Sequence, residues 1–313
     1  MPRPSVLCFG EILWDFLPDA LHAGGAPFNV AYHLRRQGVP VRVASAVGRD
    51  ALGDELLRRL AAWEIPTAGI ERDAARPTGF VRATLGAKGD ARYEIVRRVA
   101  WDRIPAGAAA LAAARRAGAF VFGSLAQRST ANRAALRRLL AALPPGALRV
   151  FDVNLRPPHD DLALVRRLAP AATLLKLNAG EAARLAGRKP AAGREEAHAR
   201  ALAAAFGCPV VVVTAGARGA GLLRDGRWHW EPGRRVEVVD TVGAGDAFLA
   251  TLLAQLLSGY ATDADALARA CRTGEWVASC RGATPAYPPA ATTRNHTAPG
   301  PRNAKPSPAR AAG

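Results

Sequence analysis

The chain has 313 residues, half of them hydrophobic and 22% charged, a balance typical of a globular protein with a large buried core. No apolar run approaches the ~20 residues that span a bilayer, and acidic residues interrupt the first run, so we expect neither a membrane span nor a secretory leader. The net charge of +17 comes mostly from arginines spread over every predicted helix, which argues against a nucleic-acid partner. Four cysteines without metal-ligand spacing fit a reducing compartment, and we expect a cytoplasmic protein.

Short apolar runs alternate with amphipathic stretches along most of the chain. The apolar runs are bounded by Gly, Pro or polar residues, as strands covered on both faces are, and they span residues 6–10, 41–48, 119–124, 149–154, 174–178 and 210–214. The stretches between them have helical spacing and span residues 29–37, 51–63, 108–117, 130–143, 162–169 and 194–206. This alternation predicts an α/β fold with a doubly wound, mostly parallel sheet flanked by helices.

Two parts of the chain depart from this pattern. Residues 78–85 and 91–96 predict a hairpin, and 12–17 a further strand beside it. Such an antiparallel patch is either a lid over a ligand or an edge decoration. From residue 288 onward, Pro, Ala, Thr and Arg recur without periodicity and predict a disordered tail. We therefore expect one domain over 1–287, with a small β lid contributed by about 11–24 and 76–100, and a tail over 288–313.

The segment 236–259 has the strongest chemical signal. Its first four residues predict a strand, Gly243-Ala244-Gly245 a turn, and the leucines that follow a helix. The N–H groups at a helix N-terminus can hold an anion, and glycines leave them unobstructed. Asp246 lies in the first turn of this helix. It is either an ordinary cap or a base that takes a proton from a hydroxyl while the turn holds a phosphoryl group.

A second glycine turn, at 24–27, leads into the helix predicted from Asn29, with Asn29 as its N-cap. The open backbone at Gly25 and the amide of Asn29 suit hydrogen bonds to a polyhydroxylated ligand. The carboxylate of Asp15 can accept from two vicinal hydroxyls, because it has several lone pairs and no donor. A turn or capping role explains each of these residues equally well.

Six segments, in this order, resemble the PfkB, or ribokinase-like, family of carbohydrate kinases. They are GEILWDF, GGAPFN, FDVNLR, KLNAGE, VTAGARG and DTVGAGDAF, which lie between residue 5 and about 287. The first two and the last are most similar to bacterial fructokinases. The resemblance implies a ribokinase-like fold and an enzyme that transfers a phosphoryl group from ATP to a sugar.

The resemblance also implies a role for residues around the acceptor. It makes Asp246 the catalytic base, and it assigns the anion hole to Gly243, Ala244 and Gly245. Sugar hydroxyls are assigned to Asp15, Gly25 and Asn29. Arg156, in the loop after FDVN, is expected to approach the phosphates or the sugar.

On the nucleotide side, the resemblance assigns the family's N-x-x-E element to Asn178 and Glu181, with Glu181 holding Mg²⁺ through water. From spacing alone, these two residues are a helix cap and an exposed helix residue. The turn that lines the ATP phosphates and ribose is assigned to Thr214, Gly216 and Gly219, and an antiparallel extension through 222–230 follows it. The backbone around Asp240 and Val242, with 279–282, resembles the K⁺ site of some relatives.

The sequence thus predicts an ATP- and Mg²⁺-dependent carbohydrate kinase whose favoured reaction is fructose to fructose 6-phosphate. One alternative is the same fold acting on another acceptor: 2-keto-3-deoxygluconate, ribose or a nucleoside. A second is a non-catalytic sensor of sugar or nucleotide, against which Asp246 and its paired glycines argue. The expected partners are the sugar and ATP, without nucleic acid or membrane, and the lid strands fit either a monomer or a homodimer.

Overall fold

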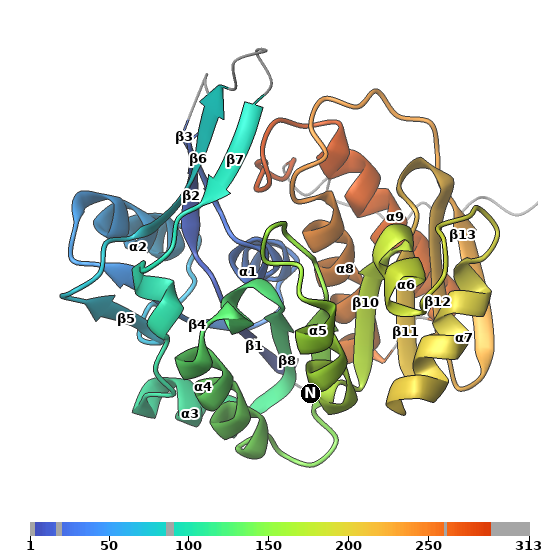
Figure 1. The fold of residues 1–313 in the computed structure, drawn as a ribbon, viewed down its shortest axis with the longest axis horizontal. Helices are drawn as coiled ribbons and strands as arrows, with labels where there is room; N and C mark the ends of the chain where they lie inside the picture. The colour runs from blue at the N-terminus through green and yellow to red at the C-terminus, as the bar shows by residue number, and fades with distance from the viewer. Residues whose placement is uncertain (1–3, 17–20, 86–90, 260–261, 289–313) are drawn as a thin grey trace, which may run out of the picture.

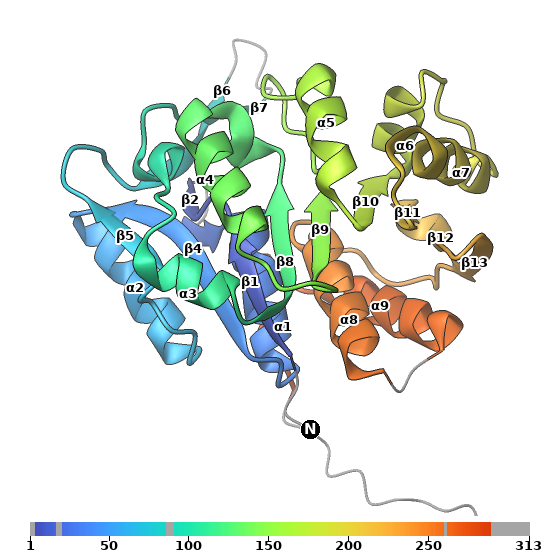
Figure 2. The same cartoon turned by 90° about the horizontal axis from the view of Figure 1, so that it is seen from below.

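The computed structural model describes residues 4–16, 21–85, 91–259 and 262–288, and its centre is a nine-stranded sheet between two layers of helices (Figures 1 and 2). In sheet order the strands are β13 (Arg227–Pro232), β12 (Gly219–Arg224), β11 (Val210–Thr214), β10 (Leu174–Asn178), β9 (Leu148–Asp152), β8 (Ala117–Gly123), β1 (Ser5–Phe9), β4 (Val41–Gly48) and β5 (Ile70–Asp73). All neighbours from β11 to β5 are parallel, and β12 and β13 are antiparallel. This confirms the predicted mostly parallel sheet, with β12 and β13 as the antiparallel extension.

The helices form one hydrophobic core on each face of this sheet. One layer is α1 (Ala26–Arg36), α2 (Ala51–Ala62), α8 (Ala244–Ser258) and α9 (Asp263–Ala278), and the other is α3 (Ala108–Ala114), α4 (Thr130–Ala141), α5 (Leu162–Leu168), α6 (Ala179–Leu185) and α7 (Glu195–Phe206). Along β1, Val6 and Cys8 pack into the first core, and Leu7 and Phe9 into the second. Successive side chains of a strand point to opposite faces, so burial on both faces explains why the strands are continuous apolar runs.

A second sheet of four strands projects beyond the first (Figure 1). Its order is β3 (Leu21–Gly24), β2 (Leu13–Phe16), β6 (Gly79–Leu85) and β7 (Ala91–Ile95). The β6–β7 hairpin and β2 match the predicted lid strands, although β2 runs parallel to β6. The described residues also contain four short 3₁₀ segments: η1 (Ala100–Arg103), η2 (Leu125–Arg128), η3 (Ala169–Ala171) and η4 (Gly216–Arg218).

Two local predictions of secondary structure, at 236–239 and at the start of α1, are wrong. Residues 236–239 form no strand: Val238 and Val239 are 59% and 52% exposed, and the Val239 N–H bonds the Ala278 carbonyl at the end of α9 instead of a neighbouring strand. The valines of 236–239 favour a strand, but this segment lies beside no strand with which it could pair. The helix predicted from Asn29 begins at Ala26, with Gly25 as its N-cap and a proline in its first turn, where proline fits without losing a hydrogen bond. Asn29 is consequently inside the helix and does not cap it.

The predicted tail falls almost wholly on 289–313, outside the described residues. Among the helices of the described ranges, none combines the length and hydropathy needed to cross a membrane.

Candidate active site

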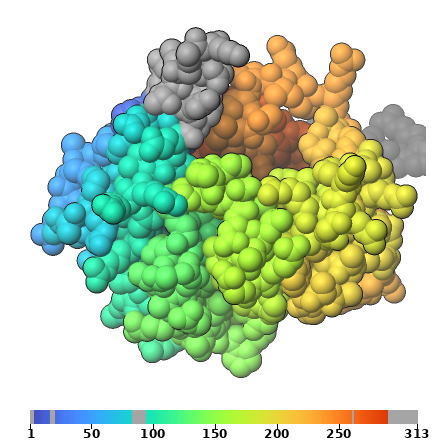
Figure 3. All heavy atoms as spheres, in the orientation of Figure 1, coloured from blue at the N-terminus to red at the C-terminus, as the bar shows by residue number. Residues whose placement is uncertain are grey.

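The order of the strands brings the predicted site residues Asn178, Thr214 and Arg156, and also Glu11, which was not predicted, to one edge of the sheet. Asn178 and Thr214 end β10 and β11, Glu11 follows β1, and Arg156 lies in the loop after β9. Because β9 lies between β10 and β1 in the sheet, its loop separates the predicted nucleotide residues from the predicted sugar residues. The space-filling view shows the surface hollowed between the teal part of the chain that holds β6 and β7 and the orange part that holds α8 and α9 (Figure 3).

The N-terminus of α8 faces this edge. Gly243 caps the helix with a φ of 78°, and a Cβ there would lie 2.5 Å from the Cα of Ala283, so only glycine fits. The Ala244 N–H already bonds a carbonyl of the preceding turn at 3.3 Å. The N–H groups of Gly245 and Asp246 have no partner among the described residues. Of the predicted anion hole at 243–245, only the Ala244 N–H is thus engaged within the described residues, and the Asp246 N–H adds a free donor that was not predicted.

Asp246 does not cap its helix. Its side chain is 9% exposed, and its Oδ2 accepts a hydrogen bond of 2.8 Å from Nδ2 of Asn29 on α1. Burial raises the pKa of Asp246 to about 6, against the opposing effects of the Lys176 charge and the Asn29 hydrogen bond. The geometry thus removes the capping alternative and leaves a buried carboxylate with raised proton affinity beside two free N–H groups.

A buried ion pair, which the sequence analysis missed, lies next to this carboxylate. Lys176 and Asp152 are register partners on β10 and β9, with Nζ 2.9 Å from Oδ2. A Cβ on Gly245 would lie 3.1 Å from that Nζ, so the ammonium group lies against the glycine turn. Burial would lower the pKa of Lys176, but the negative charges of Asp152 and Asp246 outweigh it and raise the pKa. A fixed positive charge therefore lies where the turn is expected to hold an anion.

The predicted sugar residues Asp15 and Gly25 lie on β2 and at the start of α1. A Cβ on Gly24 would be 2.6 Å from Oδ2 of Asp15, which places this carboxylate over the glycine turn. Burial raises the pKa of Asp15 to about 6, although His22 and Arg156 lower it. Gly25 has a φ of 111°, and a Cβ there would lie 2.4 Å from a backbone oxygen, so glycine is required at this turn.

Glu11 is a second residue that sequence reasoning missed. It is 2% exposed, its Oε1 accepts the Ala26 N–H at 3.3 Å, and its Oε2 has no partner among the described residues. The Oδ1 of Asn29 is also buried without a partner. Burial raises the pKa of Glu11 to about 7. The sequence analysis treated this residue only as an interruption of an apolar run, whereas a buried carboxylate with an unused oxygen is typical of a binding site.

Arg156 connects these carboxylates electrostatically. Its side chain is exposed, yet its charge lowers the pKa values of Glu11, Asp15 and Asp246 against the dominant effect of burial. One cation therefore acts on the predicted sugar-binding carboxylate of Asp15, on Glu11 and on Asp246.

On the nucleotide side, Asn178 and Glu181 form a capping box at the start of α6. Oδ1 of Asn178 accepts the Glu181 N–H at 2.9 Å, and Oε2 of Glu181 accepts the Asn178 N–H at 2.8 Å. Oε1 of Glu181 accepts the Leu155 N–H at 2.7 Å. Asn178 is thus the helix cap that spacing predicted, whereas Glu181 is buried and not exposed. Burial raises the pKa of Glu181.

The remaining predicted contacts lie in two loops at the same edge. Gly216 and Gly219 have φ values of 58° and 114° in the turn after Thr214, and a Cβ on Gly219 would lie 2.0 Å from the Glu231 carbonyl oxygen. The carboxylate of Asp240 accepts N–H groups from Val242 at 2.9 Å and from Gly282 at 3.1 Å. The two segments predicted to form a cation site are therefore joined by one side chain.

The model of the pfkB family carbohydrate kinases matches residues 19–290. The chain belongs to this family. It is 30% identical to a fructokinase of Rhizobium leguminosarum bv. trifolii over 271 residues, which cover 80% of this chain and 79% of that protein.

Solved structures of the family superpose on most of this chain. Fructokinase from Vibrio cholerae O395, with fructose, ADP and calcium, has a TM-score of 0.78 and 25% identity, covering 90% of this chain and 95% of that one. A double mutant of the same enzyme contains a potassium ion. A sugar kinase from Pyrococcus horikoshii in complex with ATP has a TM-score of 0.75 and 25% identity, covering 89% and 94%. The predicted family and ribokinase-like fold are confirmed.

Proposed function

We propose that this PfkB family member phosphorylates a sugar with ATP, and that the sugar is fructose, giving fructose 6-phosphate. The observation that carries the proposal is the placement of Asp246: a buried carboxylate that does not cap its helix and adjoins two free N–H groups and the Lys176 ammonium. A helix N-terminus with a fixed cation suits a transferring phosphoryl group, and a neighbouring carboxylate suits the hydroxyl that attacks it.

In the proposed mechanism, Asp15, Gly25 and Asn29 hold the sugar hydroxyls. Asp246 accepts the proton of the attacking hydroxyl as its oxygen bonds the γ-phosphorus of ATP and the bond to the ADP oxygen breaks. The N–H groups of Gly245 and Asp246 offset the charge of the transferring group. Because this transition state is loose, positioning and electrostatics are expected to supply most of the acceleration.

The chain also fits Mg²⁺ bound mainly by ATP phosphates and water. Each carboxylate oxygen of Glu181 accepts a single N–H, so each keeps a lone pair for a metal-bound water. The ion, when bound, neutralises phosphate charge.

The nucleotide is proposed to contact four residues at the ends of β10 and β11 and in the turn that follows β11: Asn178, Thr214, Gly216 and Gly219. The loop that Asp240 joins to Gly282, near Val242, is proposed for K⁺, by likeness to the potassium-containing Vibrio structure.

The comparisons with relatives and the hydrogen-bonding groups of the site both support fructose as the acceptor. Named relatives include fructokinases, and one structural neighbour was crystallised with fructose. In addition to the Asp15 carboxylate, the unused oxygens of Glu11 and Asn29 supply hydrogen-bond acceptors, which suits a ligand rich in hydroxyl donors.

A panel of acceptors tests the proposal. ADP release would be measured at fixed ATP and Mg²⁺ with fructose, ribose, 2-keto-3-deoxygluconate and a nucleoside. Fructose should give the highest kcat/KM, and NMR should place the phosphate on O6. A tenfold higher kcat/KM with another acceptor would replace fructose but keep the kinase. Release with none of them would favour the non-catalytic sensor.

A further inference from the structure

A cavity of about 570 Å³ lies beside the connection between β7 and η1, away from the residues assigned above. Five arginines and a single carboxylate line it: Arg76, Arg97, Arg98, Arg103, Arg128 and Asp102. It shares no lining residue with the proposed sugar, nucleotide or cation contacts. The proposed function therefore leaves it unexplained.

The positive charge of this cavity is only partly neutralised. Arg128 pairs with Asp102 and Arg76 pairs with Asp73. In the described part of the chain, no ion pair or side-chain hydrogen bond engages the guanidinium groups of the other three: Arg97, Arg98 and Arg103. Elsewhere exposed arginines commonly have carboxylate partners, as Arg200 does with Glu196. Three unpaired guanidinium groups around one cavity repel one another, and an anion would relieve that repulsion.

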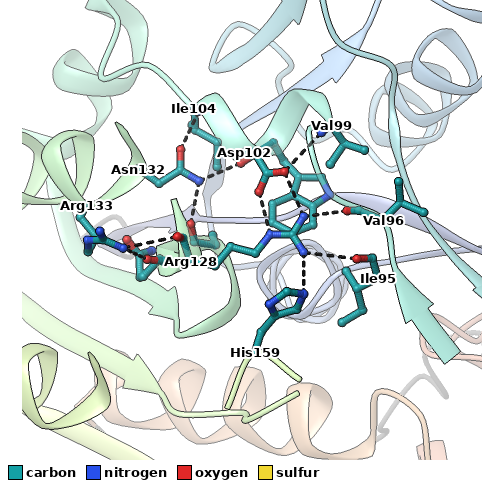
Figure 4. Close-up of polar contacts among 12 residues, drawn as sticks. Ile95, Val96, Val99, Asp102, Ile104, Arg128, Asn132, Arg133 and His159 are labelled. Atoms are coloured by element: carbon teal, nitrogen blue, oxygen red, sulfur yellow. Dashed lines mark hydrogen bonds and ion pairs between the residues drawn. The ribbon is translucent and has the colours of Figure 1, made fainter. Parts of the chain in front are cut away.

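One wall of the cavity is held by the polar contacts of Arg128 (Figure 4). Its Nε and Nη2 lie 2.7 and 3.0 Å from the two Asp102 oxygens, and Nη2 also donates to the Val96 carbonyl at 2.7 Å. Nη1 donates to Nε2 of His159 at 3.1 Å, and the guanidinium lies 4.0 Å from the Trp101 ring centroid. Every side of this group is occupied, so Arg128 and Asp102 form a fixed support for the three unpaired arginines.

Two backbone features point to the same cavity. Arg98 has a φ of 60°, a left-handed conformation that a non-glycine residue adopts at a cost and that is often found at ligand sites. The start of α4, a helix of 12 residues, contributes Ser129 and Ala131 to the lining. Its N-cap makes no side-chain hydrogen bond, and the N–H groups of residues 130–132 have no partner among the described residues. These N–H groups and the helix dipole favour an anion.

We propose that this arginine cavity binds the phosphate group of a small phosphorylated metabolite. A phosphate monoester has nearly two negative charges and three acceptor oxygens, which matches three guanidinium forks and free helix N–H groups better than a monocarboxylate. A cavity of about 570 Å³ is larger than inorganic phosphate requires, so there is room for the rest of a small molecule. Bound there, the ligand joins the segment that leaves the small sheet to the start of α4.

Calorimetric titration tests this proposal with inorganic phosphate and fructose 6-phosphate as probes. The full chain would be used at constant ionic strength, with saturating ADP and fructose to occupy the proposed nucleotide and sugar sites, so that fructose 6-phosphate cannot bind there as the reaction product. We expect saturable 1:1 binding that the double variant R98A/R103A weakens at least about tenfold, the effect of losing two charge-assisted contacts. The matched control R137A/R138A removes the same charge from exposed positions on α4 outside the cavity, and it should bind like wild type.

The outcomes separate the ligand sources and the failure modes. Binding of fructose 6-phosphate alone supports a phosphate ester site, and equal binding of both probes supports a site for the phosphate group itself. Equal loss in the two double variants, or unchanged binding in R98A/R103A, would overturn the proposal. Because neither variant touches the proposed acceptor or ATP residues, kcat with fructose separates this test from the test of kinase activity. A matching unfolding temperature without phosphate shows that R98A/R103A is folded.

Discussion

Replacing Asp246 by Asn should make the chain more stable and far less active. Burial raises the pKa of Asp246 from 3.8 to about 6. One pKa unit corresponds to about 1.4 kcal/mol, so ionising this carboxyl in the folded chain costs about 3 kcal/mol relative to the unfolded chain. Asparagine keeps the shape and a hydrogen-bonding oxygen for Asn29, but it has no charge to bury.

The direction in which pH changes this contribution to stability follows from proton binding at Asp246. Between pH 3.8 and about 6 the folded chain holds more protons at this position than the unfolded chain, so the contribution to stability falls as pH rises and then stays constant above about 6. Asp246→Asn should therefore raise the free energy of unfolding by about 3 kcal/mol at pH 8 and by about 1.5 kcal/mol at pH 5. Urea unfolding followed by circular dichroism at the two pH values measures both numbers.

Turnover with fructose should fall by roughly 10² to 10⁴ in the same variant, because the proposed base is gone. Unchanged or lower stability at pH 8, or a gain that does not shrink at pH 5, would refute the assignment of the raised pKa to burial. Near-normal turnover would instead refute the role as a base. The two measurements are independent, so either part of the reasoning can fail alone.

Two further substitutions test the residues around Asp246. Lys176→Met leaves the buried Asp152 unpaired and should lower the free energy of unfolding by about 3 to 5 kcal/mol, whereas adding Asp152→Leu should restore most of it, as urea midpoints would show. Glu11→Gln keeps an acceptor for the Ala26 N–H and puts an NH₂ group, which can donate to a hydroxyl oxygen, in place of the unused carboxylate oxygen; the KM for fructose should therefore stay within about threefold of wild type, but Glu11→Leu should raise it about tenfold or more. Equal KM values for the two Glu11 variants would contradict a hydrogen-bonding role.

Features encoded by local chemistry were predictable from the sequence. The start of α8 is one: a glycine turn, an acid in the first turn and a helical leucine pattern lie within one short segment, and the structure places them as expected. The strands of the large sheet are another, because burial on both faces leaves a continuous apolar run. The error at 236–239 has the same origin, since β-propensity describes a residue's fit to a sheet and cannot show that a neighbouring strand exists.

Features that depend on how distant segments meet were not predictable. The Lys176–Asp152 pair requires the register of β10 against β9, which neither segment reveals alone. The contact from Asn29 to Asp246 joins residues 217 positions apart. A charged residue inside an apolar strand run was the available signal for Lys176, because such a charge is rarely buried without a partner.

The cost of burying Asp246 is also what suits it to accept a proton. A carboxylate with a pKa of about 6 is about 97% ionised at pH 7.5, yet it binds a proton about a hundredfold more tightly than a solvated aspartate does. Lys176 and Asn29 limit this rise in pKa, and without them burial would raise it further and leave more of the carboxyl protonated at neutral pH. Asn29 lies on the helix on the sugar side, and Lys176 lies on a strand on the nucleotide side. The proton affinity of Asp246 thus depends on the same two halves of the fold that would position the two substrates.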